Sequence, residues 1–329
     1  TSLKLEKQLF TSYTHNEYFP GRVVMIEYSN ILAVVEPERE NQPAISRAIE
    51  LAEKTGASIT ALMTIYDFSY EMTTMLSGEE REAMRQAVVN ERTAWLKEQL
   101  AEYGQPIEAV VEWNNRPYEA IIKYALASSA DIVVKATRSH DDLRSVIFTP
   151  TDWHLVRKCP APVLLVKEHD WPQDGKIVAA VNVGTEDREH AQLNDRLTNI
   201  ALDYAKLLSG HVHLANCYPG TPLNIAIEVP EFDPESYNAS VKIHHLEEME
   251  KHSNQYNIPL DSCHVREGLP EKVIPQVAKE LDAELVIIGT VGRVGISAAL
   301  IGNTAEHVID ELNCDVLAIK PEGFESPVS

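Results

Sequence analysis

The chain is poor in cysteine and in positive charge. Its four cysteines, at positions 159, 217, 263 and 314, are widely separated and form no C-x-x-C pair. Such cysteines fit small core residues of a reducing compartment better than a disulfide framework. Lys and Arg number 29 against 50 Asp and Glu, a formal net charge of −21. An acidic surface repels phosphates, so we expect no nucleic-acid partner and interpret the acidity as an aid to solubility.

Long apolar runs are also absent from the sequence. No segment has the length and hydropathy of a membrane span, and no secretory signal pattern is visible, so we expect no membrane insertion and a cytoplasmic location. The apolar share of 44% and the length of 329 residues predict two domains with sizeable cores. Residues 1–24 show no amphipathic period and are expected to be a disordered or non-native extension before Met25, with a native short arm as the alternative.

Complete catalytic signatures are missing as well. The sequence contains no Rossmann G-x-G-x-x-G, no Walker A loop and no G-x-S-x-G elbow, so the catalytic residues stay unknown. His211 and His213 would share one face of a strand, but no third ligand lies near them in sequence, and we expect no metal site. The adjacent His244 and His245 would face different sides of a helix and are expected at the surface.

What the sequence does contain is a glycine-rich loop between an apolar run, 285–288, and a predicted helix. Its candidate binding residues are Gly289, Gly292, Gly302, Asn303 and Thr304. Glycine adopts backbone angles that other residues resist and lets an anion approach the main chain. Amides at the start of the next helix can then face that anion. A tight turn without a ligand is the alternative, but the strand–loop–helix context favours a nucleotide.

The chain contains one unit twice. Separated segments of the first half match segments of the second at a constant shift of 153 residues, as from Lys167 to Lys320. In this way Arg116–Ile121 matches Leu269–Ile274. A constant shift across separated segments indicates an internal duplication.

Each half is predicted to alternate five strands with four helices. The predicted strands are 31–35, 58–65, 108–112, 132–135 and 163–166 in the first half, and 177–181, 211–217, 261–266, 285–288 and 316–319 in the second. Short apolar strands between amphipathic helices predict an α/β fold, a doubly wound parallel sheet covered on both faces. We expect domains at 25–168 and 176–320 and a tail at 321–329. Ligands of such sheets bind outside the carboxyl ends of the strands, where Asn182 and the glycine loop would meet.

The doubled unit and the Gly289-x2-Gly292-x9-Gly302 spacing resemble the universal stress proteins in their tandem two-domain form. The resemblance covers nearly everything from residue 25 on. It implies two five-stranded domains of the adenine nucleotide alpha-hydrolase-like type, packed as an intramolecular pseudo-dimer. Duplicated units commonly descend from symmetric homodimers. In the related single-domain proteins the fifth strand commonly lies at the dimer interface, so the resemblance implies that the fifth strands, Pro162–Val166 and Asp315–Ile319, lie there. A homodimer of the whole chain stays open.

The resemblance also implies a binding site for ATP or ADP, with Mg²⁺ as an option, in the second half. It implies a contact of Asn182 with adenosine, of the Cys217 main chain with adenine, of Gly289 with ribose, and of Gly292, Gly302 and the Asn303 and Thr304 amides with phosphates. The family usually has Asp at the position of Asn182 and Ser or Thr at that of Asn303. The second departure removes a hydroxyl that could help to hold Mg²⁺ and a triphosphate.

The first half departs much further from the family pattern. At the shifted positions, Ala136, Ser139 and Thr149 replace the three glycines, and Pro150 removes an amide donor. Glu36, at the end of the first strand, adds negative charge where phosphates would lie. The first half is therefore expected to be a structural partner or a site for an unidentified small ligand.

These observations predict a cytoplasmic stress-response protein that binds ATP or ADP in its second domain. It would act through nucleotide-dependent conformation or partner choice. A slow ATPase or phosphotransferase using the same pocket and a ligand-free scaffold are the alternatives. Among minor expectations, Thr151 or Asp152 caps a helix, and Glu306 and Asp310 are solvated surface acids.

Overall fold

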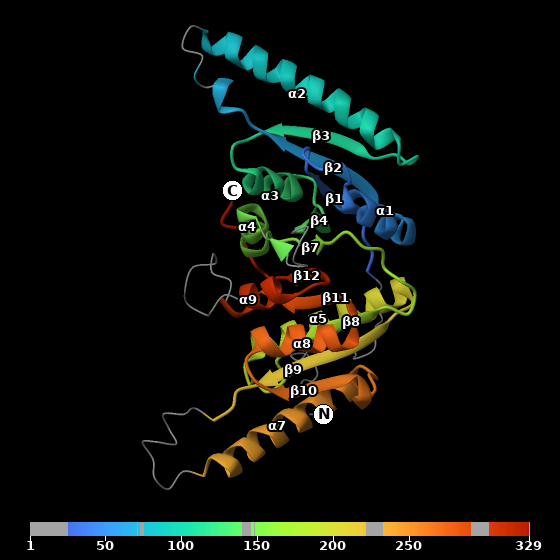
Figure 1. Ribbon diagram of the computed structural model, residues 1–329, viewed down its shortest axis with the longest axis vertical. Helices are drawn as coiled ribbons and strands as arrows, with labels where there is room; N and C mark the ends of the chain where they lie inside the picture. Colours follow the sequence, from blue (N-terminus) through green and yellow to red (C-terminus); the bar gives the residue numbers. More distant parts are fainter. Residues whose placement is uncertain are drawn as a thin grey trace, which may run out of the picture.

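The computed structural model describes residues 26–70, 72, 76–139, 146–147, 149–221, 233–290 and 303–328. The strands of the first half are β1 (Asn30–Val35), β2 (Ser58–Ile65), β3 (Glu108–Trp113), β4 (Ile132–Ala136), the short β5 (Arg138–Ser139) and β6 (Val146–Ile147), and β7 (Val163–Val166). Those of the second half are β8 (Lys176–Ala180), β9 (His211–Tyr218), β10 (Cys263–Glu267), β11 (Ala283–Gly289) and β12 (Asp315–Ile319). All except β5 and β6 belong to one ten-stranded sheet (Figure 1).

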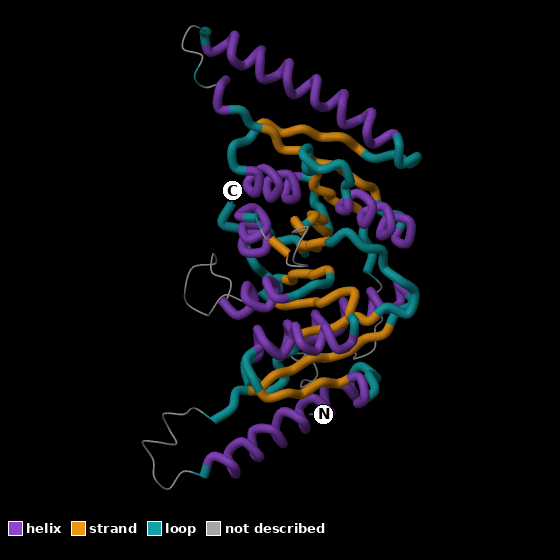
Figure 2. The backbone as a smooth tube through the Cα atoms, viewed as in Figure 1, coloured by secondary structure: helices purple, strands orange, loops and turns teal. Residues whose placement is uncertain are grey.

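The described helices cover both faces of this sheet (Figure 2). They are α1 (Pro43–Thr55), α2 (Gly78–Ala101), α3 (Pro117–Ala127), α4 (Pro150–Lys158), α5 (Arg188–Leu208), α7 (Pro234–Gln255), α8 (Pro270–Leu281) and α9 (Asn303–Glu311), with 3₁₀ turns η1 (Phe68–Tyr70) and η2 (Leu260–Ser262). Proline stands in the first turn of α1, α3, α4, α7 and α8. In the first turn a backbone N–H has no intrahelical acceptor, so proline, which lacks this group, costs no hydrogen bond there. Gly56, in the left-handed region at φ 78°, ends α1.

The strand order, β10-β9-β8-β11-β12-β7-β4-β1-β2-β3, shows the duplication directly. Each half contributes five strands in the same relative order, and neighbours within a half are parallel. The halves join through their fifth strands, because β12 pairs with β7 antiparallel, with Leu317 opposite Leu164. This confirms the tandem doubly wound fold and the pseudo-dimer. The joint also pairs two strands that would otherwise be exposed edges.

The hydrophobic core is divided by sheet face and not by domain. One cluster joins residues of α1 and α5 with the strands, including Ile45 and Leu197. The other joins α3, α4, α8 and α9 over the opposite face, including Leu155 and Val308. Because β7 and β12 make the sheet continuous, each core runs through both halves. We expected one core in each domain. The structure does have two cores, but each contains residues of both halves.

A buried polar cluster crosses the junction between the halves. Asp315 on β12 is fully buried, and its carboxylate lies 3.2 Å from the guanidinium of Arg47 on α1. The same carboxylate accepts the Lys167 backbone N–H at 2.8 Å and lies 3.3 Å from Nε2 of His169. The hydrogen bond to Asp315 raises the pKa of His169. Trp171 packs against Arg47, whose guanidinium carbon is 3.7 Å from the ring centroid.

Two minor expectations about residues of α4 and α9 are wrong. Thr149, and neither Thr151 nor Asp152, is the N-cap of α4; Asp152 instead completes a capping box from the third position. Glu306 is not a solvated acid, because its carboxylate accepts the Nε–H of Arg157 at 2.6 Å across the two halves. The cap of α4 lies two residues before Thr151. The contact of Glu306 exists because α4 and α9, from different halves, meet in the folded pseudo-dimer.

Candidate functional site

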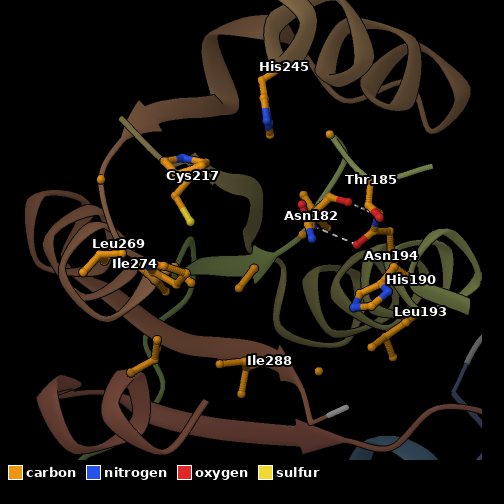
Figure 3. A pocket seen from close by; sticks show the side chains of 18 of the residues that line it. Asn182, Thr185, His190, Leu193, Asn194, Cys217, His245, Leu269, Ile274 and Ile288 are labelled. Atoms are coloured by element: carbon orange, nitrogen blue, oxygen red, sulfur yellow. Dashed lines mark hydrogen bonds between the residues drawn. The ribbon is translucent and has the colours of Figure 1, made fainter. Parts of the chain in front are cut away.

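A cavity of about 940 Å³ lies at the carboxyl ends of β8, β9 and β11. Helices α5, α7, α8 and α9 contribute to its wall (Figure 3). The chain runs from β8 to β9 on one side of the sheet order, whereas β11 lies on the other side, so the cavity occupies a topological switch point. Its size falls within the range of about 300–1,000 Å³ typical of small-molecule sites.

Three of the residues predicted for the site line this cavity: Asn182, Cys217 and Gly289. Gly292 and Gly302 lie outside the described residues. Asn303 and Thr304 form the first turn of α9, and the next residue, Ala305, is part of the cavity wall. The backbone therefore brings the strand ends and the start of α9 to one place, while the nucleotide contacts of these residues stay predictions.

Gly289 also packs closely against a neighbouring helix. A Cβ atom at this position would lie 2.5 Å from Cδ2 of Leu193 on α5. Any other residue at this position would therefore require the Leu193 side chain to shift. The sequence pattern identified the glycine, but the helix that presses on it comes from a segment about a hundred residues earlier.

Two buried asparagines hold the loop that follows β8. The side chain of Asn194, on α5, accepts the backbone N–H of Asn182 and donates to its carbonyl, both at 2.9 Å. The Oδ1 atom of Asn216, on β9, accepts the backbone N–H of Val183 at 3.2 Å. Asn216 is 1% exposed. These bonds fix the main chain that presents Asn182, and the only local signal for them is an asparagine between apolar residues of β9.

His245 is buried, so the expectation that it lies at the surface is wrong. Only 8% of the residue is exposed, and Nδ1 of its ring lies 2.9 Å from Nδ2 of Asn216. The ring projects from α7 into the cavity (Figure 3) and covers Gly184, where a Cβ would lie 2.0 Å from the ring carbon Cε1. Burial, with a smaller effect of His244, lowers the pKa of His245.

The described part of the cavity wall is nearly free of charge. Among these described lining residues there is no Lys, Arg, Asp or Glu; the titratable members are His190, His244, His245, Tyr237 and Cys217. Burial raises the pKa of Cys217 to about 11, so its thiol is protonated at neutral pH and is a poor nucleophile. Such a wall suits an uncharged, largely flat group held by a few hydrogen bonds.

The first half fills the corresponding position with charged side chains. Strand register places Lys135 where the second half has Ile288, and the repeat places Asp152 where it has Ala305; both second-half residues line the cavity. The Lys135 ammonium lies 2.8 Å from the Asp152 carboxylate and 3.0 Å from that of Glu36, which occupies the position of Asn182. Three ion-paired side chains thus occupy the place of the cavity floor.

His213 of β9 makes a contact that the sequence did not indicate. Nδ1 of His213 is 3.2 Å from Nε2 of His264 on β10. Burial, together with His264, lowers the pKa of His213 to about 4, so both rings are neutral near pH 7. Within the described residues no three potential metal ligands come together. None of the described helices has the length and hydropathy needed to cross a bilayer.

Two doubly wound halves that share one sheet, with a ligand-sized cavity at one switch point, define a tandem α/β protein. The model of the universal stress protein family matches residues 27–167 and 179–320, and the chain belongs to this family. Universal stress protein E of Escherichia coli (strain K12) is 50% identical over 308 residues, which are 92% of this chain and 98% of that protein.

Solved structures of other proteins resemble the whole fold, among them the following two. A functionally unknown protein of Pseudomonas aeruginosa PAO1 has a TM-score of 0.69 at 30% identity and covers 90% of this chain and 94% of its own. A universal stress protein of Archaeoglobus fulgidus has a TM-score of 0.59 at 17% identity, over 90% and 97% of the two chains. The second likeness shows the fold alone.

Proposed function

We propose that the protein is a cytoplasmic stress-response protein that binds one ADP or ATP in its second domain. Binding would change the conformation of the chain or its choice of partner. The observation that carries the proposal is the cavity at the β8–β11 switch point, lined by Asn182, Cys217 and Gly289. The glycine spacing that follows β11 supports it, because the resemblance to the family's ATP-binding members lies in that spacing.

The described wall fits the nucleoside better than the phosphates. It offers apolar surface with a few amide and hydroxyl groups, which suits adenine and ribose. It offers no carboxylate, the ligand type that Mg²⁺ prefers, so any Mg²⁺ would be held by the phosphates and water. The first domain would act as a structural partner, since Lys135, Asp152 and Glu36 occupy the equivalent space.

Calorimetric titration with ADP and ATP tests this proposal, together with mass spectrometry of nucleotide released from the denatured protein. We expect one nucleotide per chain. Gly292→Val should weaken binding at least tenfold, about 1.4 kcal/mol, because a side chain would occupy the phosphate position. Ser139→Val, at the equivalent position of the first half, is the matched control and should stay within about threefold.

The other outcomes point to other functions. Two equivalent sites per chain would contradict the asymmetry between the halves. Absence of any nucleotide binding would favour a ligand-free scaffold. Release of ADP and phosphate that Gly292→Val abolishes would favour a slow ATPase or phosphotransferase that uses the same cavity.

A further inference from the structure

A chain of hydrogen bonds fixes the proton position on His245. The backbone N–H of Val183 can only donate, so the atom of Asn216 that faces it at 3.2 Å is the amide oxygen. The amide nitrogen of Asn216 therefore faces the other way, 2.9 Å from Nδ1 of His245. An amide nitrogen also only donates, so Nδ1 must be the unprotonated acceptor. The neutral ring then carries its proton on Nε2.

The surroundings keep this ring neutral and in place. Burial lowers the pKa of His245, so the uncharged form predominates at pH 7. The ring packs on the main chain of Gly184, which leaves room for it only because it lacks a side chain. Tyr218 of β9 flanks it, with ring centroids 5.5 Å apart. His245 thus presents a fixed, neutral N–H donor in a cavity whose described wall is otherwise largely apolar.

We propose that His245 recognises the ligand of this cavity by donating its Nε2–H to an uncharged acceptor, a purine ring nitrogen or a ribose oxygen. Asn216 is the positioning residue that sets the tautomer. The inference rests on the proposed function, because it assigns a contact to the nucleoside bound there. A neutral donor is suited to discriminate among ligands, since a partner without the acceptor would leave the buried N–H unpaired.

Calorimetric titration of ADP into the wild type, His245→Phe and His245→Gln tests the contact. Phe keeps the bulk of the ring but has no donor, so we expect affinity to fall about tenfold, the cost of one lost hydrogen bond. Gln can place an amide N–H near the position of Nε2 and should stay within about threefold of the wild type. A wild type that binds no ADP would overturn the proposed function. A wild type that binds ADP no more tightly than the Phe variant would overturn the inference alone.

Long-range ¹H–¹⁵N correlation of the imidazole rings tests the tautomer without relying on any variant that fails to fold. We expect Nδ1 of His245 to be unprotonated, Nε2 to carry hydrogen, and the Nε2 resonance to shift when ADP is added. A proton on Nδ1 would contradict the proposal. So would an Nε2 resonance that ADP, once shown to bind, leaves unchanged.

Asn216→Asp tests the positioning role through a pH profile. A carboxylate cannot donate, so it would favour a proton on Nδ1 and, above the pKa of the ring, leave Nε2 as a bare acceptor. ADP affinity should then fall as pH rises from about 7 to 9 in this variant but not in the wild type. The titratable groups that stack on His245 or line the cavity with it (His244 and Tyr237 on α7, Tyr218 and Cys217 on β9, His190 on α5) are the same in both proteins. An equal loss at every pH would indicate a merely structural asparagine and overturn this role.

Discussion

Replacing Asp315 by Ala tests whether the junction between the halves depends on its buried charge cluster. The substitution removes a fully buried carboxylate that meets Arg47 at 3.2 Å, the Lys167 backbone N–H at 2.8 Å and His169 at 3.3 Å. Arg47 is itself only 4% exposed. Its charge would therefore stay buried after its partner across the junction is gone.

The size of the expected loss in the free energy of unfolding depends on the contacts that Arg47 retains. Breaking a buried ion pair by removing one partner typically costs about 3–5 kcal/mol, because the other charge is left uncompensated. Arg47 would still bond Glu50 at 2.5 Å and the carbonyl of His169 at 2.7 Å, and its guanidinium would still lie over Trp171. We therefore expect the lower end of the range, a decrease of about 3 kcal/mol in the free energy of unfolding.

Urea unfolding followed by tryptophan fluorescence measures this loss. We expect a single transition in both proteins, because each hydrophobic core runs through both halves. Glu311→Ala is the matched control; Glu311 pairs with Lys272 at 3.5 Å on the surface and should change stability by less than about 0.5 kcal/mol. A loss below about 1 kcal/mol for Asp315→Ala, or two separate transitions in the wild type, would refute the reasoning.

Three further predictions concern histidines and glycine. The folded state raises the pKa of His169, so its contribution to stability is present below about pH 6.5 and is lost as pH rises through the raised pKa; His169→Gln should flatten this alkaline loss in urea titrations. The folded state lowers the pKa of His213 to about 4, so the unfolded chain takes up the proton first on acidification; His213→Leu should reduce the loss of stability between about pH 6.5 and 4. Gly184→Ala should displace the ring of His245 and weaken ADP binding by about tenfold or more in calorimetry, whereas Gly78→Ala, with open space around it, should not.

The strands could be predicted almost completely from the sequence. Each central strand is a short, continuously apolar run between helices, and that pattern has few alternatives. The short strands β5 and β6 were not predicted. Within the large sheet the main difference is at β10, which begins at Cys263 and not at Asp261, because 260–262 forms a 3₁₀ turn that leads into an edge strand. The resemblance to the universal stress proteins placed the fifth strands at the interface between the halves, and β7 and β12 pair there.

The wall of the cavity could not be predicted in the same way. On α7 the buried residues are His245, Met249 and Ser253, while Ile243 and Leu246 are exposed. The apolar residues of α7 fall on no single face, so hydrophobic periodicity does not identify the face that carries the histidine. The buried histidine is satisfied by Asn216, a residue of another element, and such long-range pairs leave no local pattern.

The difference between the two halves lies in side chains more than in backbone. The second half has Ile288 and Ala305 at positions where the first has Lys135 and Asp152, on strands and helices of matching order. A buried ion pair commonly stabilises a fold no more than well-packed apolar residues of similar volume. The charged residues of the first half are therefore not expected to raise the free energy of unfolding above that of an apolar equivalent. Their ion-paired side chains do, however, occupy space that Ile288 and Ala305 leave open in the second half. One duplicated fold can in this way keep a ligand cavity in one half while the other half contributes its five strands of the shared sheet, part of both cores, and Arg47 as the buried partner of Asp315.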